Sequence, residues 1–401
     1  RPGRPTIAPP LLGGEKRSMK LGLPLFLKLS ARTFLQSRGT PARLTPKRAA
    51  VMALFIPSFA AVQIVHWLAF KLDDILFPGY RTTLIRKPLF IVGIPRSGTT
   101  HLHQVLAADT ERFTTTSLWE LIFAPAIVER KLLLGAVKLD RRLGRPLGKL
   151  FDWANHKAFG GMQDIHPIDL TAPEEDYFLL LPEMACFLLI HPFPFAEMWR
   201  VASFDKSIPP PERERVMAAY KARLQRHVYF HGPDKIVLSK NPAFSGFVRS
   251  LQKTFPDCRI VCNVRPPASS VPSLVSSMQE GVDLFDNDPR GTEYRDKLMA
   301  MLRFFYKHLG RHVLTMPRDR HRVVPMKELK SDLPGVVEDI YERFGYEITA
   351  RYREALDVEW EKARAYKSRH KHSLEQFGLT EEQVEEYFAE AAKAFDFERG
   401  A

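Results

Sequence analysis

One short segment constrains this chain most, because it joins an apolar run to a turn that is bounded by two glycines. The run reads PLFIVG (Pro88–Gly93), and the turn continues as IPRSGTT. A short apolar run of this kind predicts a buried strand. The residues that follow repeat apolar side chains at helical spacing, at Leu102, Val105 and Leu106. The segment therefore predicts a strand, a glycine-bounded turn and a helix in direct succession.

The rest of the chain repeats this alternation. Further strands are predicted at Ile236–Ser239, Arg259–Val264 and Arg322–Pro325. Helical patterns cover residues 212–227, 292–309, 334–344 and 381–395. Short apolar strands that alternate with helices favour a parallel sheet with helices packed on it. We expect an α/β fold of P-loop type, with three layers around a central parallel sheet, a mostly helical insertion at about residues 110–235 and a helical N-terminal extension.

Charge divides the chain into a basic arm and a nearly balanced remainder. The 401 residues carry a net charge of +13, and residues 1–50 hold eleven basic side chains and one acid. Such an arm could bind anionic lipid or nucleic acid, or stay solvated. No recognised nucleic-acid-binding module accompanies it, so we expect no nucleic-acid partner. We assign residues 1–80 to a basic arm with an apolar helical extension, and residues 81–401 to the main domain.

An apolar stretch follows the arm. Residues 49–70 contain no Asp, Glu, Lys or Arg, and Lys47, Arg48 and Lys71 flank them. The stretch is long enough to span a bilayer, but one proline and three polar residues dilute it. Three alternatives stay open: a spanning helix, a helix on the membrane surface, and a helix packed on the protein itself. In the second case, residues 20–75 would contact the membrane.

Cysteine content bears on compartment and on metal chemistry. Cys186, Cys258 and Cys262 form neither a disulfide framework nor a metal-ligand spacing. Buried free thiols in a reducing cytoplasm are the simplest account. We therefore expect a cytoplasmic protein and no metal, with peripheral contact to a membrane as one of the alternatives for the apolar stretch. The sequence begins without Met; Met19 is a plausible start of translation, and no pattern typical of a signal peptide is evident.

The glycines and the basic residue of the turn, and its lack of the Walker A lysine, indicate which anion it can bind. Gly93 and Gly98 are spaced like the glycines of a Walker A loop, whose main-chain N–H groups and helix N-terminus hold an anion. Thr99 takes the lysine position of that loop, and the cation sits earlier, at Arg96. No strand ends in the Asp that would hold magnesium, so a nucleotide kinase is disfavoured. An anion cradle without a metal suits a terminal sulfonate, which carries a single charge.

Here the sequence resembles a known family. The segment IVGIPRSGTTHLH resembles the 5′-phosphosulfate loop of sulfotransferases that use 3′-phosphoadenosine 5′-phosphosulfate (PAPS), in the bacterial branch whose loop reads PRSGTT. The resemblance implies that the loop and its basic residue bind the 5′-phosphosulfate. It assigns this role to Pro95, Arg96, Ser97, Gly98, Thr99 and Thr100.

The second element of this family is a strand that ends in Arg, with a Ser eight residues later that holds the 3′-phosphate. The segment VRPPASSVPS supplies Arg265 and Ser273 at this spacing. A guanidinium at a strand end and a hydroxyl on the next helix make a suitable phosphate clamp. Pro266 stands where the family usually has Asp, which changes how the turn is held. Weaker matches at LSKNP (238–242) and HKHSLEQFGLT (370–380) extend the resemblance over about residues 88–395.

The resemblance also implies a reaction. PAPS would be the co-substrate and 3′-phosphoadenosine 5′-phosphate (PAP) the product, with in-line transfer of the sulfuryl group to a hydroxyl or amine and no metal or redox cofactor. Lys240 would assist the leaving phosphate. The acceptor could be a small molecule, a lipid or a carbohydrate. Two alternatives stay open: a non-catalytic, membrane-associated nucleotide-binding protein with the same fold, and a P-loop kinase.

The acceptor must lose a proton as it attacks, so a Glu or His near the loop should act as the base. Glu120 is the first candidate, because related sulfotransferases have a catalytic acid in this stretch. His166, within the insertion, is the second. The acidic cluster at residues 174–176 is the third, although acids are also common at a helix N-terminus.

Overall fold

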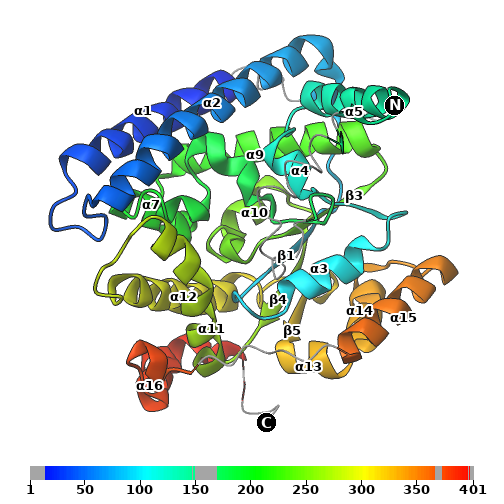
Figure 1. Cartoon of the computed structure of the whole chain (residues 1–401). Coiled ribbons are helices and arrows are strands. Elements are labelled where there is room, and N and C mark those ends of the chain that lie inside the picture. The colour runs from blue at the N-terminus through cyan, green and yellow to red at the C-terminus, as the bar shows by residue number, and fades with distance from the viewer. Residues whose placement is uncertain (1–13, 147, 150–168, 366–372, 396, 398–401) are drawn as a thin grey trace, which may run out of the picture.

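The computed structural model describes residues 14–146, 148–149, 169–365, 373–395 and 397, and its centre is a five-stranded sheet (Figure 1). All pairings are parallel, and the strand order is β2-β3-β1-β4-β5. The strands are β1 Leu89–Gly93, β2 Phe113–Thr114, β3 Ile236–Lys240, β4 Arg259–Val264 and β5 His321–Pro325. The four strands expected from the sequence are confirmed to within one residue at each end, and so is the α/β fold with a parallel sheet.

Both faces of the sheet are buried, and alternate residues of a strand serve the two faces. In β1, Phe90 and Val92 join one hydrophobic cluster, whereas Leu89 and Ile91 join another. All residues of β1 are buried. A strand that is covered on both sides has a continuous run of apolar residues in its sequence. This explains why PLFIVG lacks the polar alternation of a half-exposed strand.

Helices cover both faces of the sheet and complete the three layers (Figure 1). One face carries α3 Thr99–Ala107, α13 Met326–Ser331, α14 Leu333–Phe344 and α15 Ala350–Ala365. The other carries α9 Pro210–His231, α10 Val248–Thr254, α11 Pro267–Leu284, α12 Glu293–His312 and α16 Glu381–Ala392. The four helices expected from apolar spacing correspond to α9, α12, α14 and α16.

Where the structure describes it, at residues 110–146, 148–149 and 169–235, the insertion between α3 and β3 is mostly helical, as expected, with one exception. Its helical elements are α4 Leu118–Ile122, α5 Ile127–Arg142, η2 Asp176–Glu183, η3 Phe187–Ile190, α7 Ala196–Trp199, η4 Arg200–Ser203, α8 Phe204–Ser207 and α9. The exception is β2, which pairs with β3 and forms one edge of the sheet. A strand of two residues has no periodicity, so a sequence pattern does not reveal it.

The helical N-terminal extension consists of α1 Gly14–Leu35 and α2 Pro46–Leu76, which lie side by side along the outside of the molecule (Figure 1). Phe26 of α1 and Met52 of α2 belong to the same hydrophobic cluster as α9 and α12. Among the described residues, α2 is the one helix that is long and apolar enough to cross a membrane. The domain boundary at residue 80 stays a prediction.

Candidate active site

The loop at residues 93–100 leaves the sheet through a very close contact. Gly93 ends β1 with a φ of 140°, and a Cβ atom there would lie 2.0 Å from the main-chain oxygen of Asn263 in β4. Only glycine fits, because other residues rarely adopt this φ and no space exists for a side chain. The Ser245 hydroxyl accepts from Gly93 N at 3.0 Å and donates to Gly93 O at 2.7 Å. The start of the loop is therefore fixed from two sides.

Inside the loop, polar groups hold the shape of the main chain. Ile94 N donates to Asn263 O at 2.9 Å, and Ser97 Oγ donates to Ile94 O at 2.5 Å. Asn263 Nδ2 donates to Ser97 O at 3.3 Å. Arg96 and Gly98 have left-handed φ angles of 68° and 84°. A non-glycine residue in this region costs about 1 kcal/mol or more, and such strain is typical of functional loops.

Helix α3 begins directly after this loop, at Thr99. The first N–H groups of a helix have no acceptor within the helix, and the helix dipole makes this end positive. Thr99 is buried against the sheet, whereas Thr100 and Arg96 are exposed. The strand, the loop and the helix N-terminus together therefore favour an anion at this end of the sheet.

Two arginines and a serine from distant parts of the chain meet at the loop. Arg265, which follows β4, donates from Nη1 to the main-chain oxygen of Arg96 at 3.0 Å. Arg96 Nε donates to Ser273 Oγ of α11 at 3.2 Å. The buried Tyr306 hydroxyl donates to the main-chain oxygen of Arg265, which fixes the end of β4.

No carboxylate among the described residues pairs with either guanidinium of this group. Burial lowers the pKa of Arg265, and the positive charge of Arg96 lowers it further. Two like charges held together without an acid are unfavourable unless an anion joins them. The structure thus brings Arg96, Arg265 and Ser273 together, and the roles that the sequence gives them in holding the 5′-phosphosulfate and the 3′-phosphate stay predictions.

Lys240 lies at the carboxyl end of β3, beside β1, and its side chain is almost fully buried. Its ammonium contacts Glu175 Oε1 at 2.8 Å and Glu174 Oε1 at 3.8 Å. Burial raises the pKa of Glu175, although the charge of Lys240 opposes this shift. The structure thus brings two groups together that the sequence treated separately: Lys240 and the acidic cluster at residues 174–176.

His103, in the first turns of α3, faces the same region. It is fully buried, and its Nε2 bonds to Thr115 Oγ1 at 2.7 Å. Burial lowers the pKa of His103 to about 3, and the charge of Lys240 contributes to this shift. The ring is therefore neutral at neutral pH, and its Nδ1 has no hydrogen-bond partner among the residues that the structure describes.

Comparison with known proteins assigns this geometry to a family. The model of the sulfotransferase family matches residues 88–350, from the start of β1 to the start of α15. The chain belongs to the sulfotransferase family. The match contains the loop, Lys240, Arg265 and Ser273.

Solved structures support the same fold for this sulfotransferase. Sulfotransferase STF9 from Mycobacterium avium is 20% identical with a TM-score of 0.73, and the alignment covers 98% of each chain. Sulfotransferase STF1 from Mycobacterium tuberculosis H37Rv is 18% identical with a TM-score of 0.61, covering 96% of this chain and all of the other. No curated protein matches the chain by sequence. Both alignments include the N-terminal extension, so α1 and α2 fall within the matched fold.

Glu120, the first candidate base of this sulfotransferase, lies in a buried network on α4. Its Oε2 accepts from Ser117 N at 3.0 Å and from Ser117 Oγ at 2.8 Å, which caps the helix. Its Oε1 lies 2.6 Å from His231 Nε2 and 3.4 Å from Arg130 Nε. Burial opposes its ionisation, but His231 and Arg130 outweigh burial and lower the pKa. These contacts favour a structural carboxylate, because a base needs a free lone pair and a pKa near the working pH.

Glu120 also belongs to the one group in the described part of the chain whose ligand atoms lie close enough for a metal ion, with His227 and His231. The fully buried Arg130 already supplies a positive charge beside the carboxylate. A divalent cation would add two further charges to this buried site, and burying unbalanced charge is costly. The group therefore fits an ion-pair network better than a metal site.

The remaining candidates divide between two regions. His166 lies outside the described residues. Asp176, the last acid of the cluster, is buried and accepts from the Tyr220 hydroxyl. Burial raises the pKa of Asp176 to about 6. Its partner lies on α9, so Asp176 ties the start of η2 to that helix.

The sequence analysis missed Asn263, Ser245 and Tyr306. These residues hydrogen-bond to main-chain groups of the loop or of Arg265 and so hold the site in shape. Asn263 carried a signal, because it is a polar residue inside the apolar run RIVCNV. Ser245 and Tyr306 carried none, since each acts through a main-chain group that is remote in sequence.

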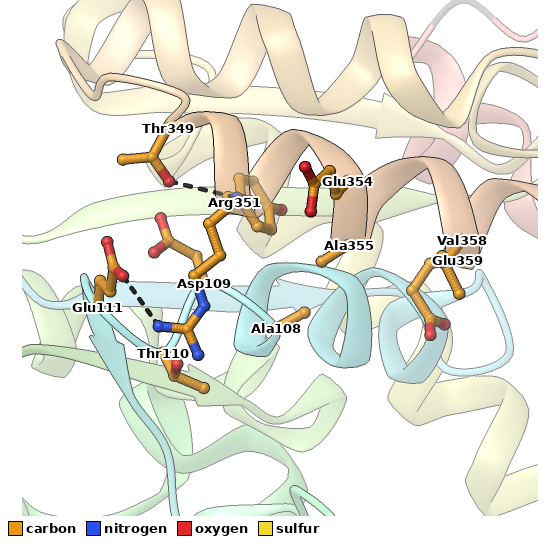
Figure 2. Close-up of a pocket in the computed structure, with 11 residues that line it drawn as sticks. Ala108, Asp109, Thr110, Glu111, Thr349, Arg351, Glu354, Ala355, Val358 and Glu359 are labelled. Atoms are coloured by element: carbon orange, nitrogen blue, oxygen red, sulfur yellow. Dashed lines mark hydrogen bonds and ion pairs between the residues drawn. The ribbon is translucent and has the colours of Figure 1, made fainter.

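A hollow of about 440 Å³ lies at the opposite end of α3 (Figure 2). Asp109, Glu111, Glu354 and Glu359 line it, and Arg351 crosses it to pair with Glu111 at 3.0 Å. Four carboxylates against one arginine make this hollow unsuitable for an anionic nucleotide. It also lies at the far end of α3 from the loop, so the active site is placed by the loop rather than by this hollow.

Proposed function

We propose that this sulfotransferase takes its sulfuryl group from PAPS and transfers it to a hydroxyl or amine of an acceptor. The observation that carries the proposal is the meeting of Arg96, Arg265 and Ser273 at the N-terminus of α3. PAPS has anionic groups at both its 5′ and its 3′ position. A site with a helix N-terminus and two guanidinium groups that no described carboxylate neutralises suits such a ligand.

The two ends of PAPS would bind to different parts of this site. The loop at residues 95–100 and Arg96 would hold the 5′-phosphosulfate, through main-chain N–H groups and the guanidinium. Arg265 and Ser273 would hold the 3′-phosphate. Arg96 Nε already donates to Ser273 Oγ, so a bound nucleotide would replace or share this hydrogen bond. The hydrogen bond from the Arg265 guanidinium to the main-chain oxygen of Arg96 would keep the two subsites in register.

The reaction is a single in-line displacement. The acceptor oxygen or nitrogen attacks the sulfur atom and forms a new bond to it. The bond between sulfur and the 5′-phosphate oxygen breaks, and PAP leaves with that electron pair. The acceptor proton passes to a base. Lys240, beside the loop strand, would offset the charge that develops on the leaving phosphate.

We assign the proton transfer to Glu175, the partner of Lys240. A carboxylate whose pKa burial raises is a better base than one whose pKa is lowered, which favours Glu175 over Glu120. Glu175 also lies next to a cation at the carboxyl edge of the sheet, whereas the contacts of Glu120 lie on α4, α5 and α9. His166 remains the alternative base.

Calorimetric titration with PAP in the absence of magnesium tests the donor site. We expect wild-type protein to bind PAP, and Arg265→Ala to weaken binding by about tenfold to a hundredfold, the usual value of a charge-assisted hydrogen bond. Arg351→Ala is the matched control, because it removes an exposed arginine from the hollow in Figure 2. No PAP binding, or ATP binding that requires magnesium, would refute the proposal.

Labelled PAPS tests the transfer itself. Small-molecule, lipid and carbohydrate acceptors are supplied in turn, and label on any of them demonstrates catalysis. PAP binding without transfer to any acceptor class would instead favour a non-catalytic nucleotide-binding protein.

A further inference from the structure

Helix α2 presents a long surface without charge. From Ala50 to its end at Leu76, every exposed residue of this helix is uncharged, and Ser58 is the one polar residue among them. Several are large: Leu54 is 71% exposed and Ile75 is 74% exposed. The other large exposed residues are Val62, Ile64, Val65, Leu68, Leu72 and Leu76. A surface helix normally turns charged residues outward, so this pattern is inverted.

The opposite side of α2 is attached to the protein at three points along its length. Arg48, near the start, is fully buried and donates to the main-chain oxygens of Phe285 and Pro192, both at 2.8 Å. Asp73, near the end, accepts from Arg226 at 3.0 Å.

The third point is His66, midway along the helix, which contacts Glu129 at 2.7 Å. Buried polar contacts of this kind are costly to break. The helix therefore stays along the protein with its apolar side outward, which disfavours the spanning alternative.

Helix α5 continues the apolar surface. It packs against α2 where Val128 meets Ala69 and Phe70, and Figure 1 shows α1, α2 and α5 along the same side of the molecule. All residues from Lys131 to Leu139 are exposed. The apolar members of this exposed segment include Leu132, Leu133, Leu134, Val137 and Leu139.

Basic side chains border this apolar surface, and none of the acids within residues 22–76 or in α5 is exposed. Exposed Arg38 and Arg43 precede α2, and exposed Lys47 lies in its first turn. Helix α5 carries exposed Lys131, Lys138, Arg141 and Arg142. Within residues 22–76 the acids are Asp73, which is buried, and Asp74, which pairs with Arg81. An apolar face with a basic border matches the surface of an anionic bilayer, where acyl chains lie beneath negative headgroups.

We propose that the exposed face of α1, α2 and α5 docks this protein on an anionic membrane surface, with α2 lying in the plane of the interface. Apolar side chains of α2 and α5 enter the acyl boundary, and the basic border contacts the headgroups. A second copy of the chain would also cover an apolar face, but the basic residues around it would then face each other and repel. The proposal is independent of which sulfuryl donor or acceptor the enzyme uses.

Flotation with lipid vesicles tests the proposal on the full chain. One set of vesicles contains phosphatidylcholine alone, and the other also contains phosphatidylglycerol. We expect wild-type protein to float with the anionic vesicles and to bind the neutral ones more weakly. Added salt should weaken the binding without abolishing it, because the apolar contact is not screened.

A matched pair of variants locates the contact. Val65→Glu with Leu68→Glu places two charges on the exposed face of α2, where these residues are 56% and 51% exposed. Leu284→Glu with Val358→Glu makes the same chemical change on α11 and α15, at 55% and 53% exposure. We expect the α2 pair to lower the vesicle partition coefficient by about tenfold or more, and the control pair to leave it unchanged. All four residues are exposed, so both variants should fold.

Three outcomes would overturn the proposal. Wild-type protein could fail to float with either kind of vesicle. The α2 pair could retain full binding, which would assign the lipid contact to the basic arm alone. Light scattering without lipid could show a dimer that the α2 pair dissociates while vesicle binding is absent, which would assign the face to a second copy of the chain.

Discussion

The Arg265 guanidinium donates a hydrogen bond to the main-chain oxygen of Arg96, with 3.0 Å between Nη1 and O. This contact joins the end of β4 to the loop that follows β1. It uses one of the five N–H donors of Arg265 and leaves the others for a ligand. Arg265 therefore has two tasks, to position the loop and to bind an anion.

The variant Arg265→Lys tests whether these two tasks require a guanidinium or only a positive charge. Lysine keeps the positive charge but lacks the planar fork that reaches a carbonyl and a phosphate together. We expect PAP to bind about tenfold more weakly to this variant than to wild type, as measured by calorimetry. Wild-type affinity in Arg265→Lys would show that charge alone holds the 3′-phosphate.

The left-handed conformation of Arg96 predicts that two substitutions with the same effect on binding differ in their effect on stability. Arg96→Gly and Arg96→Ala remove the same guanidinium, so both should weaken PAP binding equally. Glycine adopts a φ of 68° without strain, whereas alanine does not. We expect the glycine variant to be more stable than the alanine variant by about 1 kcal/mol in urea unfolding, the usual cost of a left-handed conformation for a residue with a Cβ atom. Equal stabilities would mean that the loop relaxes when the arginine is removed.

Much of the fold could be predicted because the deciding residues are consecutive in sequence. The run at Leu89–Gly93 is buried on both faces, so its apolar character alone indicates a strand in a covered sheet. Helix α16 could be predicted from its cap, since Thr380 accepts from Gln383 N and Gln383 reaches back to Thr380 N. β2 could not be predicted, because its two residues become a strand only by pairing with β3.

The candidate active site also has parts that the sequence predicts and parts that it does not. Arg96 and Gly98 lie within one local motif, so their proximity follows from the sequence itself. The pairing of Lys240 with Glu175 joins positions 65 residues apart, through a chain path with no regular pattern. For Glu120, its place after the loop helix suggests catalysis, whereas its contacts favour a structural role. Its actual partners on α5 and α9 come from residues that sequence spacing does not connect to it.

The pair of Glu175 and Lys240 predicts the pH dependence of transfer. A base must be ionised to accept a proton, and burial raises the pKa of Glu175. Activity should therefore fall, as pH decreases, at a pH above the range of an ordinary glutamate. Lys240→Met removes the cation that favours the carboxylate, so the acidic limb of the kcat/KM profile should move to higher pH.

Glu174→Gln is the matched control for this shift. The charge of Glu174 raises the pKa of Glu175, so its removal should move the acidic limb to lower pH. Glu175→Gln should abolish the limb together with most of the activity. An acidic limb that none of these variants moves would transfer the role of base to another residue, with His166 the next to test.

The contacts of Glu120 predict that its substitution lowers the stability of the protein rather than the rate of sulfuryl transfer. Its carboxylate is 2% exposed and lies between Arg130 and His231, and these partners lower its pKa in the folded protein. A carboxyl group whose folded pKa is lowered stabilises the protein above its ordinary pKa, and this contribution is lost as pH falls through the folded pKa. Glu120→Gln leaves Arg130 buried without its partner, so we expect about 3 kcal/mol lower stability at neutral pH.

Urea unfolding at a series of pH values checks this prediction. The difference between wild type and Glu120→Gln should be constant near neutral pH and should narrow as pH falls below the ordinary range of a glutamate, because protonation then neutralises the wild-type carboxylate too. Glu111→Gln is the control, since it breaks the exposed ion pair with Arg351 and should cost less than about 1 kcal/mol. If Glu120→Gln instead keeps full stability and loses turnover, the carboxylate acts on the acceptor, and the assignment of the base to Glu175 is wrong.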